Sequence, residues 1–215
     1  MNLSEQPSSD ELIIPAIFYY MGIDGVNHMR ILIVDNGGQW THREWRVVRD
    51  LGADTAMIPN TTPLEKIDAD GIVLSGGSPR VGVNIDAMGL NGKYLDELQI
   101  PILGICAGIQ FMAVHFGGKA GPSKNPEFGK MKIHVDDPDV LFRGIPKTFI
   151  GWESHNDEVL VIPEGFKVLA HSDNSAIQAM RCLKKPIFGL QFHPEVEHTE
   201  HGYDIFSNFL ALCKR

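Results

Sequence analysis

One cysteine has the neighbours that a nucleophile needs. Cys106 lies in GICAG, where Gly104 and Gly108 flank it at equal distances between an apolar strand and a helix. A nucleophile elbow has this layout, because small flanking residues allow a tight turn that lifts the central side chain above the sheet. The N-terminus of the following helix lowers the pKa of a thiol and offers N–H groups to an oxyanion. Since free cysteines are often buried, a core cysteine is the alternative.

A cysteine nucleophile also needs a general base and a group that orients the base. His193 and Glu195 follow the apolar strand PIFGLQF, and Pro194 between them stiffens the link. Such a turn would direct the imidazole outward with the carboxylate behind it. Taken alone, His193 could equally be a hydrogen-bonded or exposed histidine.

Two glycines could supply part of an oxyanion site. Gly76 and Gly77 end the strand GIVLSGG, and backbone N–H groups at such a strand end can stabilise an oxyanion. A plain turn is the alternative. The loop continues with Ser78-Pro79-Arg80 instead of the Asp-Ser of ATP pyrophosphatases, and the chain has no P-loop and no G-x-G-x-x-G, so no ATP site is predicted here.

The segment VEHTEH contains residues of metal-ligand type, namely Glu197, His198, Glu200 and His201. No matching cluster accompanies them, which favours a solvated helix start. We therefore expect neither a metal nor another cofactor in this chain.

Strands and helices alternate from Arg30 onwards. The first half predicts strands at residues 30–35, 54–59, 71–77 and 100–106, and helices at 39–52, 92–99 and 107–118. The second half predicts shorter strands at 130–135, 148–154, 158–162, 167–172, 175–181 and 186–192, and a closing helix at 202–215. This order predicts an α/β fold with an open, mostly parallel, flavodoxin- or Rossmann-like sheet, helices on both faces and small antiparallel additions. Ligands bind beyond the carboxyl ends of such strands, where the motifs of Cys106 and Gly76–Gly77 would lie.

Composition excludes several classes of protein. A net charge of −8 over 215 residues argues against a nucleic-acid partner, and no segment is long and apolar enough for a membrane. Three widely spaced cysteines without a CxxC pattern favour the reducing cytoplasm. Residues 1–28 lack the basic region of a signal peptide and are interpreted as an N-terminal extension. We hypothesise that translation starts at Met29. One domain is predicted over residues 29–215.

Taken together, the motifs SGG, GICAGIQ and HPE resemble those of the class I (triad) glutamine amidotransferases. The resemblance extends from Arg30 to Arg215 and includes the order Cys, His, Glu. Within that family the chain is most similar to the glutaminase part of GMP synthetases, mainly in EFG and SHNDEV. The fold that the resemblance implies is the class I glutamine amidotransferase fold.

The resemblance implies a role for each motif residue. Cys106 would attack the side-chain amide of glutamine, His193 would carry the proton to the leaving ammonia, and Glu195 would orient His193. The N–H groups of Gly77 and Ala107 would hold the oxyanion, and water would hydrolyse the thioester. The residues implied in substrate binding are Gly76, Gln110, Asn156 and Asp157.

Two positions depart from the family pattern. Ala107 replaces a larger residue, often Tyr or Leu, although the backbone N–H is unaffected. Asn156 stands where the GMP synthetase pattern has glycine, and because Asn tolerates a left-handed backbone, a turn is expected to persist there.

The sequence has no ATP pyrophosphatase module and no XMP-binding region. The resemblance therefore implies a heterodimer in which this chain passes ammonia to a separate ATP-dependent subunit that aminates XMP to GMP, with ATP and Mg²⁺ bound on that partner. Alternatives are an amidotransferase subunit for anthranilate, histidine or purine-ring biosynthesis, a non-catalytic regulatory module of the same fold, and a thiol hydrolase or peptidase.

Overall fold

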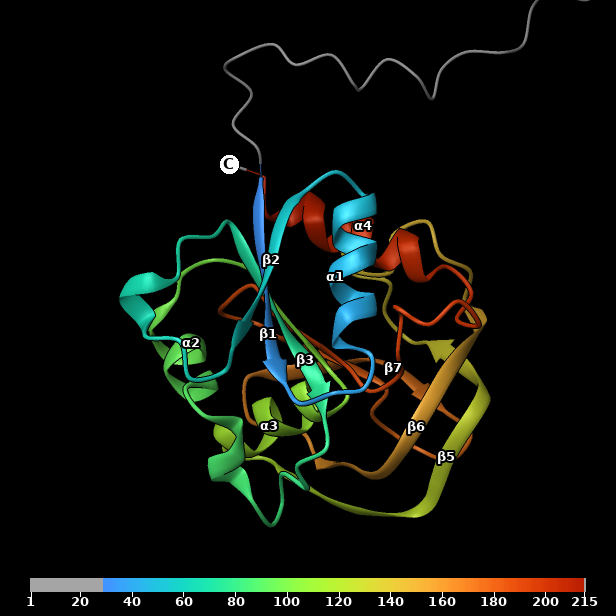
Figure 1. The fold of residues 1–215 in the computed structure, drawn as a ribbon. Helices are drawn as coiled ribbons and strands as arrows, with labels where there is room; N and C mark the ends of the chain where they lie inside the picture. The colour runs from blue at the N-terminus through green and yellow to red at the C-terminus, as the bar shows by residue number, and fades with distance from the viewer. Residues whose placement is uncertain (1–28, 215) are drawn as a thin grey trace, which may run out of the picture.

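A nine-stranded sheet forms the centre of the computed structural model, which describes residues 29–214 (Figure 1). The predicted extension, residues 1–28, lies outside the described residues. None of the helices within 29–214 is long and apolar enough to cross a membrane.

The elements of the first half follow the predicted alternation. They are β1 (Arg30–Asn36), α1 (Thr41–Asp50), β2 (Asp54–Pro59), β3 (Gly71–Gly77), α2 (Asn91–Glu97), β4 (Ile102–Ile105) and α3 (Ala107–His115). Two short 3₁₀ helices, η1 (Leu64–Lys66) and η2 (Ile85–Met88), lie in the connections. The second half consists of β5 (Lys119–Val135), β6 (Thr148–Val161), β7 (Phe166–Ser172), β8 (Ala179–Cys182), β9 (Ile187–Leu190) and α4 (Gly202–Leu212).

The sheet has a parallel half and an antiparallel half. Its strand order is β2-β1-β3-β4-β9-β8-β7-β5-β6, and the pairings from β2 to β9 are all parallel. The remaining strands join β9 through antiparallel pairings. The α/β fold class is thus confirmed, and the carboxyl ends of β3, β4 and β9 meet at one edge of the parallel half.

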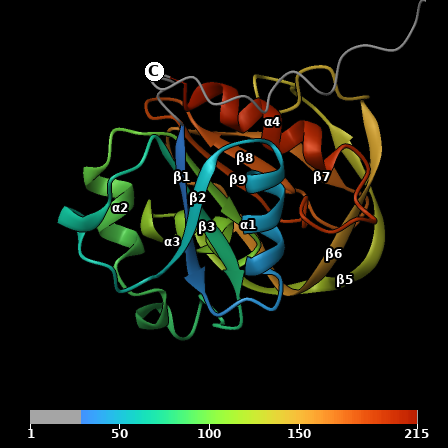
Figure 2. The same ribbon diagram turned by 45° about the horizontal axis from the view of Figure 1, so that its top comes forward.

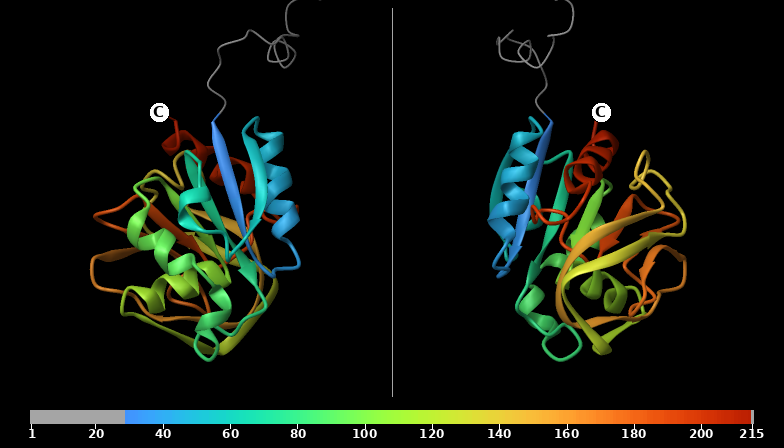
Figure 3. Two further views of the ribbon diagram at one scale, coloured as in Figure 1. Left: turned by 60° about the vertical axis from the view of Figure 1, so that its left-hand side comes forward. Right: turned by 90° about the vertical axis from the view of Figure 1, so that its right-hand side faces the viewer.

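Helices cover both faces of the sheet, α1 and α4 on one side and α2 and α3 on the other (Figure 3). Successive residues of β1 point to opposite faces, so Ile31 and Ile33 pack with α1 and α4 while Leu32 and Val34 pack with α2 and α3. Because both faces are buried, the parallel strands are continuous apolar runs, which is why they were predictable.

The long hairpin of β5 and β6, at the edge of the sheet opposite β2, differs from the prediction (Figure 2). Two strands with a turn at Asn156 were expected, but β6 is one strand of 14 residues. Asn156 is not among the non-glycine residues with positive φ in the described chain. The expectation was wrong because β6 continues through Asn156, and the extra residues of the irregular pairing, 123–126, lie in β5 between Pro122 and Glu127.

Candidate active site

Cys106 lies where β4 turns into α3. Its backbone is left-handed, with φ 51° and ψ −104°, and the residue is 8% exposed. A Cβ atom on Gly108 would lie 2.5 Å from the carbonyl oxygen of Leu74, and one on Gly104 would lie 2.8 Å from the carbonyl carbon of Gly108. The two glycines therefore let α3 start directly against β3 and β4, which produces the predicted elbow.

His193 and Glu195 form a buried pair in the turn after β9. Nδ1 of His193 lies 2.6 Å from Oε1 of Glu195, so Nδ1 carries the proton that it donates to the carboxylate. Thr199, which the sequence interpretation missed, holds the turn, because its hydroxyl donates to the His193 carbonyl at 2.6 Å and accepts from the Trp152 N–H at 2.9 Å. The ring of Trp40 packs edge-on against His193, with centroids 4.5 Å apart.

The charges of the pair and of the cysteine favour an imidazolium at His193. Burial lowers the pKa of His193, but the negative charges of Glu195 and Cys106 outweigh burial and raise this pKa well above 6.5. Gly76 allows His193 and Cys106 to approach, since a Cβ on Gly76 would lie 3.3 Å from Cε1 of His193 and 3.6 Å from Cβ of Cys106. The three residues predicted to form the triad are therefore brought together.

The two predicted oxyanion donors lie on the same cavity as Cys106. Ala107 begins α3, and an N–H group in the first turn of a helix has no intrahelical acceptor. Gly77 ends β3 and lines this cavity together with Cys106 and Ala107. The N–H of Gly76 points elsewhere and donates to Oε1 of Glu44 at 3.3 Å.

We call this space, of about 410 Å³, the glutamine cavity; it contains most of the predicted substrate-binding residues. Gln110, Asn156 and Asp157 line it, whereas Gly76 lines a neighbouring cavity. Nε2 of Gln110 donates to the Asp157 carbonyl at 2.7 Å. The Asp157 carboxylate accepts two hydrogen bonds from Arg80, at 2.9 and 3.1 Å, so Arg80 competes with a substrate ammonium for this carboxylate.

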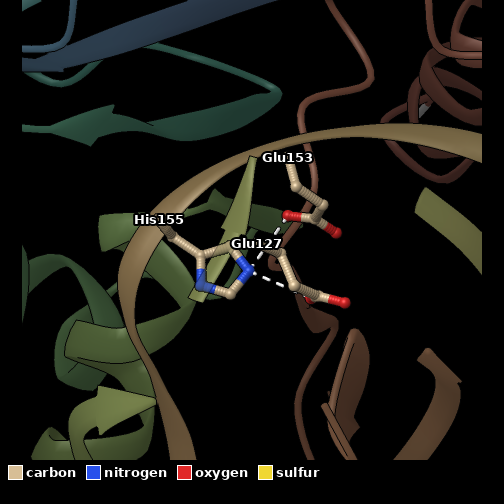
Figure 4. Close-up of side chains that lie close together, drawn as sticks. All are labelled: Glu127, Glu153 and His155. Carbon is tan, nitrogen blue, oxygen red and sulfur yellow. Dashed lines mark hydrogen bonds and ion pairs between the residues drawn. The ribbon is translucent and has the colours of Figure 1, made fainter. Parts of the chain in front are cut away.

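A cluster of ionisable residues on β5 and β6 was not predicted (Figure 4). Nε2 of His155 lies 3.2 Å from a carboxylate oxygen of both Glu127 and Glu153, and all three side chains are almost completely buried. Glu127 also accepts hydrogen bonds from Ser172 at 2.7 Å and from Gln178 at 2.6 Å. These residue types could ligate a metal, but an imidazolium at His155 already supplies the cation that the carboxylates need.

Electrostatics support this ion-pair arrangement. Burial alone would lower the pKa of His155, but the contacts with Glu127 and Glu153 raise it to about 10. Burial raises the pKa of Glu127, but its hydrogen bonds with His155 and Ser172 make the net shift downward. The cluster borders the active site, since His155 lines the glutamine cavity beside Asn156.

We expect His155→Leu to lower the free energy of unfolding by about 3–5 kcal/mol, because it leaves two buried carboxylates without a cation. The contribution of His155 is fully present below pH 6.5, its unfolded pKa, and is lost as the pH rises through about 10. Urea titrations of both proteins from pH 6 to pH 10 measure this difference. His134→Leu, which removes an ion pair with the exposed Asp173, is the control and should cost less than about 1 kcal/mol. An equal effect of both variants would contradict the prediction.

The chain belongs to the class I glutamine amidotransferase family, whose model matches residues 32–213. The A subunit of glutamine-hydrolysing GMP synthase from Thermoplasma acidophilum is 48% identical over 86% of this chain and 93% of its own length. The protein of the same description from Thermococcus kodakarensis is 49% identical over 85% of this chain and 98% of its own length.

Solved structures agree with this assignment. The crystal structure of a protein from T. acidophilum superimposes with a TM-score of 0.83, at 48% identity, over 86% of this chain and 94% of that one. A glutamine amidotransferase of Thermotoga maritima shares the fold at a TM-score of 0.66 and 22% identity, over 79% of this chain and 77% of that one.

Proposed function

We propose that this chain is the glutaminase subunit of a two-subunit GMP synthetase, with residues 29–215 as its amidotransferase domain. The observation that carries the proposal is the buried Cys106–His193–Glu195 arrangement, whose cysteine lines the glutamine cavity. Relatives described as the glutamine-hydrolysing A subunit of GMP synthase, 44–49% identical over at least 85% of the chain, support the assignment to GMP synthesis.

The geometry supports hydrolysis through a thioester. The Cys106 thiolate attacks Cδ of glutamine, and the N–H groups of Gly77 and Ala107 stabilise the oxyanion, each donor contributing roughly 3 kcal/mol in comparable sites. Collapse of the tetrahedral intermediate breaks the C–N bond, and the nitrogen takes a proton from Nε2 of His193 and leaves as ammonia. His193 then deprotonates a water molecule that attacks the thioester, which releases glutamate and restores the thiolate. Glu195 holds the imidazole in the required tautomer throughout.

Ammonia passes to a separate partner. The relatives are each described as one subunit of their enzyme, which supports a second subunit that we propose to bind ATP and Mg²⁺ and to aminate XMP in the cytoplasm. Because Arg80 occupies the Asp157 carboxylate in the isolated chain, we expect weak glutaminase activity until the partner rearranges this pair.

Reconstitution tests the proposal. The chain is mixed with the ATP pyrophosphatase subunit of a GMP synthetase, XMP, ATP, Mg²⁺ and glutamine, and GMP and glutamate are measured. We expect glutamine-dependent GMP formation and faster glutamate release than without the partner. Ammonium chloride in place of glutamine checks that the partner itself is active. The proposal is wrong if two results are found together. The GMP synthetase partner uses ammonium but not glutamine, and a synthetase subunit that acts on another acceptor, such as chorismate, stimulates glutamate release by this chain.

A further inference from the structure

A second cavity adjoins the glutamine cavity and also reaches Cys106. It measures about 280 Å³ and is lined by Trp40 and Glu44 from the α1 region, Gly76 and His193. Cys106 lines both cavities, whereas His193 lines only this second one, which we call the His193 cavity. Gly77, Ser78 and Ser154 also line both cavities, so the two spaces meet beside Cys106 and differ in the other residues that line them.

The chemistry of the proposed function, on which this inference rests, places two small molecules on the His193 side. The leaving nitrogen takes its proton from Nε2 of His193, and the attacking water gives its proton to the same atom. Each must lie within hydrogen-bond reach of His193 when the proton moves. Ammonia is therefore released into the His193 cavity, and water enters from it.

Glu44 is a buried side chain in this cavity with an oxygen atom that is free to bind such molecules. It is 1% exposed, Oε1 accepts the Gly76 N–H, and Oε2 has no hydrogen-bond partner among residues 29–214. A buried polar atom without a partner is costly, so a polar ligand in the cavity would be favoured there. Burial raises the pKa of Glu44 well above 4.5, and the charges of Glu195 and Cys106 act in the same direction.

We propose that Glu44 and His193 form a subsite for small hydrogen-bonding molecules, which holds ammonia as it leaves and the hydrolytic water as it enters. A protonated Glu44 donates its O–H to the nitrogen or oxygen, and its carbonyl oxygen accepts an N–H or O–H. No bond to Glu44 forms or breaks. The proton that ammonia gains comes from His193, and the proton that water loses returns to His193.

Glu44→Met tests the subsite in the reconstituted complex, because methionine has a similar length and no strong hydrogen-bonding group. Hydroxylamine is added as a competing nucleophile, and glutamate and γ-glutamyl hydroxamate are measured together. We expect hydrolysis of the thioester to fall about tenfold, with a matching rise in the ratio of hydroxamate to glutamate. Fewer molecules of GMP should form per glutamate. Glu44→Gln, which retains both donor and acceptor, should recover most of the loss.

Glu153→Met is the matched control. Glu153 is also a buried glutamate whose charge acts on His193, but its carboxylate pairs with His155 at 3.2 Å and it lines neither cavity. The ratio of hydroxamate to glutamate in Glu153→Met should equal that of the wild type. The subsite would be overturned if the ratio of hydroxamate to glutamate in Glu44→Met equalled that of the wild type. It would also be overturned if this ratio rose equally in Glu44→Met and Glu153→Met. If Glu44→Met does not fold, Glu44→Leu carries the same expectation. Absence of glutamate from the wild-type complex would instead show that the proposed function is wrong.

Discussion

Replacing Cys106 with alanine is expected to reduce glutamine hydrolysis by roughly 10⁵-fold or more, since losing the nucleophile of a triad costs nearly as much as losing the whole triad. The methyl group cannot form the thioester, and no other cysteine can substitute, because Cys182 and Cys213 do not line the glutamine cavity. Glutamate release and glutamine-dependent GMP formation in the reconstituted complex measure the loss.

Two controls separate this effect from damage to the fold or to the partner. Ammonium-dependent GMP formation should remain at the wild-type rate, because the partner does not need the glutaminase for it. Cys182→Ala removes a thiol that is 8% exposed, as Cys106 is, but that lies outside both cavities, and glutamine hydrolysis should persist. Retention of more than about one hundredth of the activity in Cys106→Ala would exclude Cys106 as the nucleophile.

Glu195→Gln is expected to lower the rate of hydrolysis by roughly 10³–10⁴-fold, as the comparable substitution does in a serine triad. Glutamine can turn its amide nitrogen towards Nδ1 of His193, which then stabilises the wrong tautomer. Removal of the negative charge also lowers the pKa of His193, so the imidazolium at His193 is less favoured. Steady-state rates and the pH dependence of Cys106 alkylation measure the two effects.

The matched control for this substitution is Glu197→Gln, two residues further along the same turn. Its side chain is exposed and takes no part in the triad, so the rate and the pH dependence of alkylation should match the wild type. A wild-type pH profile in Glu195→Gln, even with a reduced rate, would mean that Glu195 acts only on the structure of the turn.

Local patterns were sufficient to predict the parallel half of the fold and the residues that it brings together around Cys106. The strands before Cys106 and His193 are buried on both faces, so they are continuous apolar runs with clear ends. A parallel sheet gathers such ends at one edge, and residues far apart in sequence meet there without any long-range signal in the sequence.

The buried glutamates could not be predicted in the same way. Glu44 lies in THREWRVVRD, where its polar neighbours His42, Arg43 and Arg46 are exposed. The available signal was its spacing from Thr41 and Val48, which places it on the buried face of α1. Glu153 was missed because the environment of β6 depends on β5, whose pairing with β6 is non-local.

The left-handed backbone of Cys106 has a consequence for the evolution of this chain. A non-glycine residue at φ 51° costs of order 1–3 kcal/mol, a noticeable part of the 5–15 kcal/mol by which a typical domain is stable. Glycine adopts this conformation without that cost. Selection for stability alone would therefore favour the loss of the sulfur at position 106, so the cysteine persists there only while selection for reactivity opposes that gain.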